Sequence, residues 1–222
     1  MKFIVSEIQF SKIEILGFDM DGTLYDEFDF IKQVYFEIAK MFAKEKDCIE
    51  VDVVFESMIN IWLEKGSSYP YIFSEVLTDL GFDENHKSQI IDDALKIFRN
   101  FKPTLTLSAR MRFVLTNLKM TKQLFLISDG SSTLQWNKIV ALGLLDYFKK
   151  ENIFISGDYP SGFGKPSLHS LNFINIFQGN VDSKNVIYIG DRKVDQDFAL
   201  SAGFHFFYQD SINDIFRQIN KN

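Results

Sequence analysis

Residues 13–25 read IEILGFDMDGTLY, an apolar run that ends in two aspartates followed by glycine and threonine. A buried strand accepts Ile, Leu and Phe, but it does not accept the two unpaired charges of Asp19 and Asp21. We therefore expect these aspartates at the carboxyl end of a strand, where an α/β sheet opens its ligand crevice. Two carboxylates at alternate positions favour a cation beside them, which indicates metal-assisted chemistry on an anionic substrate.

The composition is typical of an ordinary globular protein. Hydrophobic residues make up 46% of the 222 residues and charged residues 24%, so the length allows one sizeable core plus an inserted module. A net charge of −6 disfavours nucleic acid as a partner, because nucleic-acid binders present a basic face. Cys48 has no second cysteine to pair with, and no run of 18 apolar residues occurs. We expect a cytoplasmic protein with no membrane partner.

Apolar residues at helical spacing dominate the region after the first strand. Gly66 and Gly81 stand where two of these segments should end. The spacing predicts helices around 31–42, 55–62, 73–80 and 91–98. A connection this long must have structure of its own, so we predict an all-helical cap domain over residues 26–102.

The pattern changes at Pro103 to helices that alternate with short apolar strands. Strands are predicted at 124–128, 153–156, 186–190 and 205–208, and helices over 108–118, up to Leu142, after Ser167 and after Ser211. This alternation predicts the α/β class with a doubly wound parallel sheet. The core domain would consist of residues 1–25 and 103–222.

Polar residues follow the predicted strands at the point where each should end, or lie in the loop beyond. Because the carboxyl ends of parallel strands share one edge of a sheet, these side chains are expected to converge. They are Asp19, Asp21, Ser128, Asp129, Lys165, Asp191 and Asp195. Each also has a structural interpretation, as a helix cap or a solvated surface residue. The repetition at successive strand ends favours a shared site.

These residues resemble the haloacid dehalogenase-like hydrolase superfamily, in the subgroup with a helical cap after the first strand. DMDGT at 19–23 matches the first motif of the family residue for residue, and Ser128 matches the hydroxyl of the second. GKP at 164–166 resembles the third motif, and GDRKVDQDFALSAG at 190–203 the fourth. The resemblance covers essentially the whole chain beyond about residue 10.

The resemblance implies a phosphatase that works through an aspartyl-phosphate. Asp19 would be the nucleophile, and with an unperturbed pKa of about 3.9 its carboxylate would need no base. Asp21 would be the general acid and then the base for water. Ser128 would donate to a phosphoryl oxygen, and Lys165 would neutralise the charge of the transition state. Relatives that cleave carbon–halogen bonds generally lack the second aspartate, so Asp21 favours phosphoryl chemistry.

The cofactor implied is Mg²⁺, which suits ligands that are all oxygen. The Asp19 carboxylate, the main-chain carbonyl of Asp21 and Asp191 would be its protein ligands. Asp195 would be a further ligand or would orient a metal-bound water.

Two positions depart from the family pattern. Asp129 stands where relatives usually have Asn, and Arg192 where a Ser is common. We include both among the substrate-binding residues. A compensating contact between Asp129 and Arg192 is a hypothesis.

The partner expected is a small phosphorylated metabolite, and the sequence does not specify which one. Three alternatives stay open: a phosphomutase of the same superfamily, a phosphonate-cleaving enzyme that would use a cap lysine, and a non-catalytic binding protein that kept the fold. The lysines available in the cap are Lys32, Lys40, Lys44 and Lys46. The sequence does not reveal the oligomeric state.

Overall fold

The computed structural model describes residues 10–46 and 49–212. Contacts between Cα atoms divide the chain into two compact units, residues 1–27 with 105–222 and residues 28–104. The second unit begins and ends two residues later than the cap predicted at 26–102. No helix among the described residues is long and apolar enough to span a membrane.

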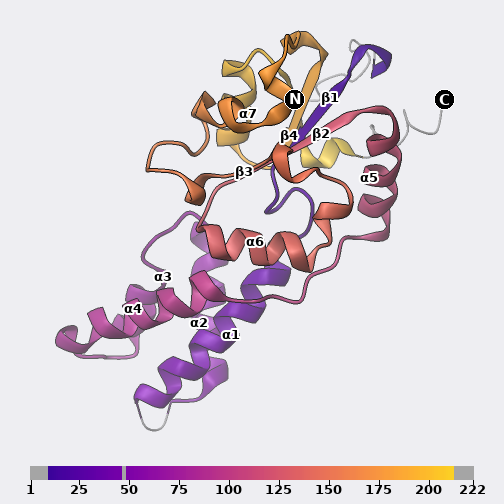
Figure 1. The fold of residues 1–222 in the computed structure, drawn as a ribbon. Coiled ribbons are helices and arrows are strands. Elements are labelled where there is room, and N and C mark those ends of the chain that lie inside the picture. Colours follow the sequence, from indigo (N-terminus) through magenta and orange to yellow (C-terminus); the bar gives the residue numbers. More distant parts are fainter. Residues whose placement is uncertain (1–9, 47–48, 213–222) are drawn as a thin grey trace. The chain divides into compact units, whose positions relative to one another are not determined.

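The first unit is built on a parallel sheet of five strands (Figure 1). The strands are β1 (Ile15–Phe18), β2 (Gln123–Ser128), β3 (Ile153–Ile155), β4 (Val186–Gly190) and β5 (His205–Tyr208). Their order is β3-β2-β1-β4-β5, and every neighbouring pair is parallel. The predicted α/β class is therefore confirmed. The chain runs outward from β1 to β3 and then returns to β4 on the other side of β1. This reversal between β1 and β4 is where open α/β sheets bind ligands.

Successive side chains of each strand point to opposite faces of the sheet, and both faces are apolar. Phe125 and Tyr188 lie on one face with Phe198 of helix α7 (Lys193–Ser201) in a buried cluster. Phe18 points to the other face, where its ring meets Phe148 edge-on at 5.8 Å. Strands buried on both faces explain why β1, β2 and β4 read as nearly continuous apolar runs.

Three α-helices connect the strands of the core. They are α5 (Ala109–Thr121), α6 (Ser132–Ala141) and α7 (Lys193–Ser201). Ser108 caps α5 as predicted, since its hydroxyl accepts the Met111 N–H at 3.1 Å. Short 3₁₀ turns cover Phe10–Lys12, Leu144–Asp146, Lys150–Asn152, Ser156–Asp158, Leu168–Phe173, Asn175–Gln178, Ser183–Asn185 and Gln209–Ser211.

The α-helix predicted after Ser167 is wrong. Ser167 caps a turn by accepting the His169 N–H, but only 3₁₀ turns follow, at Leu168–Phe173 and Asn175–Gln178. Ile174 between them is extended, and both Ile174 and Ile176 are buried in the core cluster. Packing these side chains into the sheet prevents one continuous helix. The helix predicted after Ser211 falls on residues 213–222, outside the described residues.

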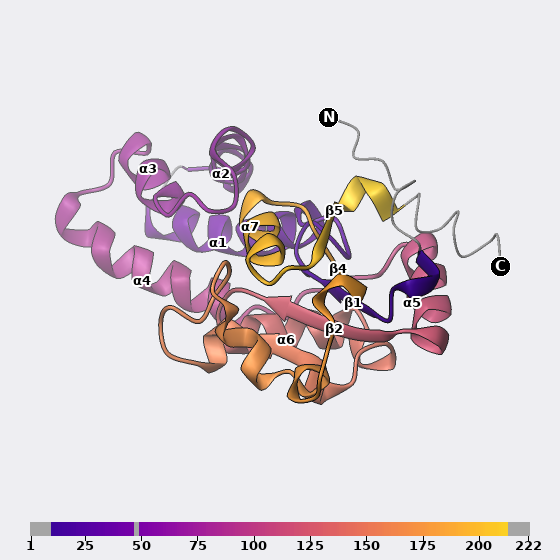
Figure 2. The same cartoon turned by 90° about the horizontal axis from the view of Figure 1, so that it is seen from above.

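The described residues of the second unit form four α-helices that pack on one another (Figure 2). They are α1 (Phe28–Glu45), α2 (Val51–Lys65), α3 (Ile72–Asp79) and α4 (Glu84–Asn100). Gly66 and Gly81 have positive φ angles of 78° and 70° at the ends of α2 and α3, as the sequence predicts. Phe73 joins three helices, because its ring contacts Tyr35 of α1 at 5.9 Å and Phe98 of α4 at 6.4 Å.

The fold depends on close packing at Gly17, in the middle of β1. A Cβ at this position would lie 2.1 Å from the Phe125 ring. We expect Gly17→Ala to lower the free energy of unfolding by about 1–3 kcal/mol, because a packed ring would have to move. Urea unfolding measures the change. Gly179→Ala is the matched control, since nothing lies within 4 Å of its added Cβ. Wild-type stability of Gly17→Ala would contradict the prediction.

Candidate active site

The first motif forms a turn against the end of the neighbouring strand. Asp19 directly follows β1, and its N–H donates to Ile189 of β4 at 2.9 Å. Thr23 Oγ1 donates to Asp191 Oδ1 at 3.4 Å. Gly22 has a φ of 74°, and a Cβ there would lie 2.5 Å from Asp191 Oδ2. The glycine is therefore required both by its backbone conformation and by the approach of Asp191.

Three carboxylates converge at this edge of the sheet. Asp19, Asp191 and Asp195 each offer one oxygen, and these oxygens lie within 4.8 Å of one another. Asp195 is completely buried in the first turn of α7, where it accepts the Arg192 N–H at 3.0 Å. Oxygen donors gathered this closely suit a hard divalent cation.

Lys165 connects two of these carboxylates. Its Nζ forms ion pairs with Asp19 and, at 2.6 Å, with Asp195 Oδ1. The Lys165 side chain is completely buried. The loop after β3 therefore places a positive charge among the negative charges from β1 and α7, as convergence at the strand ends requires.

Two buried oxygens beside this network find no hydrogen-bond partner among the described residues. They are Asp19 Oδ2 and Ser128 Oγ, the latter at the end of β2. Buried polar atoms in native proteins are almost always hydrogen-bonded. The two atoms are therefore available to a ligand.

Asp21 belongs to a separate network that the sequence analysis missed. Lys138 Nζ lies 2.7 Å from Asp21 Oδ1, and Gln135 Nε2 donates to Asp21 Oδ2 at 3.2 Å. The Tyr25 hydroxyl also donates to Asp21 Oδ1. Gln135 and Lys138 are both buried in α6. Their signal in the sequence was a polar pair three residues apart, flanked by the core residues Leu134 and Ile139.

Burial shapes the electrostatics of the carboxylate cluster. It raises the pKa of Asp19 to about 7, although the charge of Lys165 opposes this. The expectation of an unperturbed Asp19 is therefore wrong. Burial and the charge of Asp195 also raise the pKa of Asp191. Burial alone would lower the pKa of Lys165, but the Asp19 charge and its neighbours raise it well above the ordinary value, which keeps the ammonium charged.

Asp21 responds in the opposite direction. Burial again favours its neutral form, but the charge of Lys138 and the hydrogen bonds from Lys138, Tyr25 and Gln135 lower its pKa overall. The two aspartates of the first motif thus occupy different electrostatic environments although only Met20 separates them.

The structure gives Asp129 a role in the loop that carries Lys165. Its carboxylate accepts the Lys165 main-chain N–H, at 3.3 Å and 3.2 Å from its two oxygens. Burial alone would lower the pKa of Arg192, but the charges of Asp19, Asp195 and Asp191 raise it overall. The pairing of Asp129 with Arg192 stays a prediction.

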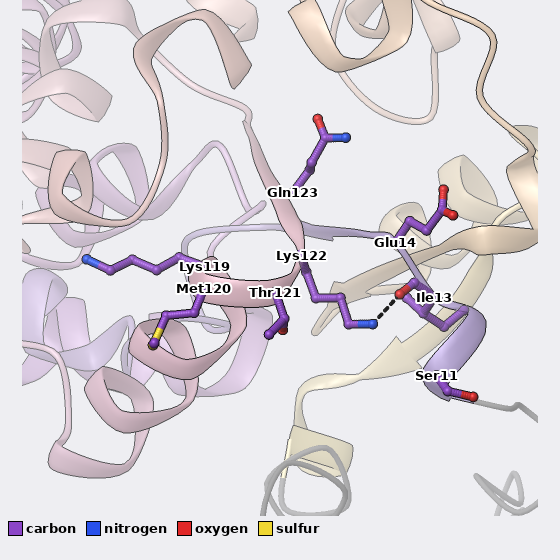
Figure 3. Close-up of a pocket in the computed structure, with 8 residues that line it drawn as sticks. All are labelled: Ser11, Ile13, Glu14, Lys119, Met120, Thr121, Lys122 and Gln123. Atoms are coloured by element: carbon purple, nitrogen blue, oxygen red, sulfur yellow. Dashed lines mark hydrogen bonds between the residues drawn. The ribbon is translucent and has the colours of Figure 1, made fainter. Parts of the chain in front are cut away.

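A cavity of about 480 Å³ lies elsewhere, at the amino ends of β1 and β2 (Figure 3). It is lined by residues of the segment before β1 and by residues 119–123. Lys122 closes one side, with its Nζ donating to the Ile13 carbonyl. This is the opposite edge of the sheet from the carboxylate cluster, so the cavity has no part in the site.

One hydrolase family matches most of the chain. The family model for haloacid dehalogenase-like hydrolases matches residues 16–208, and the chain belongs to that family.

Similar proteins agree with this assignment. The glyceraldehyde 3-phosphate phosphatase of Methanocaldococcus jannaschii is 27% identical over 187 residues, which are 81% of this chain and 76% of that protein. A haloacid dehalogenase superfamily hydrolase of subfamily IA, variant 1, from Geobacter sulfurreducens has a TM-score of 0.67 at 20% identity, covering 92% of this chain and 96% of that one. The hydrolase YfnB of Bacillus subtilis, solved with bound magnesium, has a TM-score of 0.61 at 20% identity, with 87% and 85% covered.

Asp129 provides a test of how the Lys165 loop is held. We expect Asp129→Ala to lower the free energy of unfolding by about 1–2 kcal/mol and to speed hydrogen exchange at the Lys165 amide, because that N–H loses its acceptor. Asp129→Asn keeps a carbonyl oxygen and should stay near the wild type in both measurements. Urea unfolding and amide exchange provide the readouts. Equal protection of the Lys165 amide in Asp129→Ala would show that the carboxylate does not hold it.

Proposed function

We propose that this protein is a Mg²⁺-dependent phosphatase that hydrolyses a small phosphorylated metabolite through an aspartyl-phosphate intermediate. The observation that carries the proposal is the Lys165 ammonium between Asp19 and Asp195, beside the unpartnered atoms Asp19 Oδ2 and Ser128 Oγ. A nucleophile, a fixed positive charge and a hydroxyl donor around one point are the groups that phosphoryl transfer needs.

Asp19 would attack the phosphorus with Oδ2, since Lys165 already holds Oδ1. The ammonium favours the ionised form of Asp19, against the effect of burial, and would neutralise charge that develops on the phosphoryl oxygens. Ser128 Oγ would donate a hydrogen bond to one of those oxygens. Arg192 adds a second positive charge close to Asp19.

Asp21 would protonate the oxygen of the leaving group as its bond to phosphorus breaks. The same carboxylate would then take a proton from the water that hydrolyses the aspartyl-phosphate. It is 13% exposed, whereas Asp19 is only 2% exposed. Asp21 is held by Lys138 and Gln135, whereas Asp19 pairs with Lys165, so the acid and base group and the nucleophile have different partners.

The residues present fit a divalent cation. Asp19 and Asp191 would hold it through their carboxylates and Asp21 through its main-chain carbonyl, with Asp195 as a further ligand or as the partner of a bound water. Bound Mg²⁺ would reduce the repulsion between the carboxylates and an incoming phosphate. The grouping of one oxygen each from Asp19, Asp191 and Asp195 supports this assignment.

We propose that the helical unit acts as a cap that selects the substrate. Relatives named glyceraldehyde 3-phosphate phosphatase in Methanocaldococcus jannaschii and Pyrococcus furiosus are 27% and 28% identical. This supports a small phosphorylated aldehyde or a related sugar phosphate as the substrate. The phosphomutase and binding-protein alternatives remain outcomes of the tests below. In the cap, Lys32 pairs with Asp29 and Lys40 with Glu37 in exposed ion pairs, so neither favours the phosphonate-cleaving alternative.

The decisive assay measures inorganic phosphate released from glyceraldehyde 3-phosphate in the presence of Mg²⁺. We expect turnover by the wild type and a loss of about 10³-fold or more in kcat for Asp19→Asn, which removes the nucleophile. Asp79→Asn, at an exposed position in α3, is the matched control and should keep full activity. Conversion to an isomer without phosphate release would indicate a mutase, and failure on a panel of phosphomonoesters would indicate a binding protein.

Metal binding can be tested without turnover. We expect Mg²⁺ at ten times its dissociation constant to stabilise the protein by about 1.4 kcal/mol, because it binds the folded state. Thermal unfolding with and without the ion measures this. Asp191→Asn should weaken binding about 10-fold or more by removing a charged ligand, while Asp79→Asn should respond like the wild type. A wild type that gains no stability from Mg²⁺ would refute the metal assignment.

A further inference from the structure

We infer that Lys138, together with Gln135, is a positioning residue that orients Asp21 for proton transfer to the leaving group. The inference rests on the proposed phosphatase function and adds residues that the family motifs do not include. Lys138 acts through Asp21 and is itself buried, with 3% of its side chain exposed.

Helix α6 anchors both oxygens of the Asp21 carboxylate. Lys138 Nζ lies 2.7 Å from Oδ1, and Gln135 Nε2 lies 3.2 Å from Oδ2. Gln135 and Lys138 are three residues apart, so they share one face of the helix. Two donors from one rigid element fix the plane of the carboxylate, and the Tyr25 hydroxyl adds a third contact on Oδ1.

The same helix face also ties Asp21 to the loop after β2. Gln135 Nε2 donates to the Asp129 main-chain carbonyl at 2.7 Å, one residue beyond Ser128. The amide of Gln135 thus links Asp21, the proposed acid, to the loop after Ser128, which would bind the phosphoryl group. Helix α6 therefore sets the distance between these two groups.

Stability alone gives a poor account of Lys138. A buried ion pair is often no more stabilising than apolar residues of similar size, because both charges lose their hydration. The neighbours of Lys138 and Gln135 along α6 include Leu134 and Ile139, which are 3% and 0% exposed. An apolar side chain would suit such a face, yet a lysine lies there against the acid and base group.

Each aspartate of the first motif therefore pairs with a different lysine. Lys165 pairs with Asp19 and Asp195, while Lys138 pairs with Asp21. Departure of the alcohol uses the protonated form of Asp21, which the contacts with Lys138 and Gln135 make the minor form but the stronger acid. Its O–H bond breaks as a new one forms on the leaving oxygen, and the P–O bond breaks with it. Lys138 and Gln135 then stabilise the carboxylate left behind, which later accepts the proton of the attacking water.

Dependence on the leaving group separates this role from a structural one. The quantity measured is kcat/KM, which covers the steps up to loss of the alcohol. We compare an alkyl ester, glyceraldehyde 3-phosphate, with an aryl ester, p-nitrophenyl phosphate, whose leaving group departs without an acid. We expect Lys138→Met to lower kcat/KM about 10- to 100-fold on the alkyl ester, mainly through kcat, and less than about 3-fold on the aryl ester. Lys138→Arg should recover part of the loss.

The matched control is Lys96→Met. Lys96 forms an ion pair of the same 2.7 Å length with Asp93, but its side chain is 68% exposed, and kinetics should be unchanged on both esters. If Lys138→Met does not fold, as judged by circular dichroism, Gln135→Leu replaces it. Its loss of kcat/KM should again be larger on the alkyl ester than on the aryl ester, but smaller than the loss expected for Lys138→Met. Equal losses on the two esters in a folded variant would overturn the positioning role. A wild type that hydrolyses neither ester would instead refute the phosphatase function itself.

Discussion

The site depends on one electrostatic constraint, the burial of carboxylates at the carboxyl edge of the sheet. Asp19, Asp191 and Asp195 bring oxygens within 4.8 Å of one another. Asp19 and Asp195 are buried, and like charges at that distance repel strongly where water is excluded. Lys165 offsets part of this repulsion from inside the cluster, with its side chain completely buried. The sheet topology makes the arrangement possible. Strands β2 and β3 are added on one side of β1, and β4 and β5 on the other, which leaves the carboxyl ends of β1 and β4 open to a ligand. The turn at Gly22 and Thr23 then closes against Asp191.

Much of this architecture follows from local chemistry and could be predicted. Asp19 and Asp191 end apolar runs, and only the edge of a parallel sheet accommodates charges there. Gly66 and Gly81 mark helix ends because their backbones have positive φ angles. The environment of each carboxylate could not be predicted in the same way. Whether Asp19 has a raised pKa and Asp21 a lowered one depends on burial and on which lysine reaches it, and both lysines are distant in sequence.

The errors have the same origin in tertiary packing. The segment after Ser167 has a good helix cap, but Ile174, which is extended, and Ile176 both enter the core, and packing overrides the local preference. Lys138 was part of a predicted helix and had no role, because a lysine in a helix is usually solvated. Only its burial and its ion pair with Asp21 distinguish it from the exposed lysines of the chain. Its spacing beside Leu134 and Ile139 places it on the apolar face of the helix, but residue type and spacing do not identify Asp21 as its partner.

The raised pKa of Asp19 also links the site to stability. A folded-state pKa of about 7 exceeds the ordinary value of 3.8, so the folded protein binds more protons than the unfolded chain between these values. Stability from this group is therefore lost as the pH rises through that range. Burial opposes the ionised form of Asp19, and a ligand that brings positive charge to the carboxylate cluster favours that form. The electrostatic strain that weakens the fold at this edge is thus the same property that favours binding of a cation there.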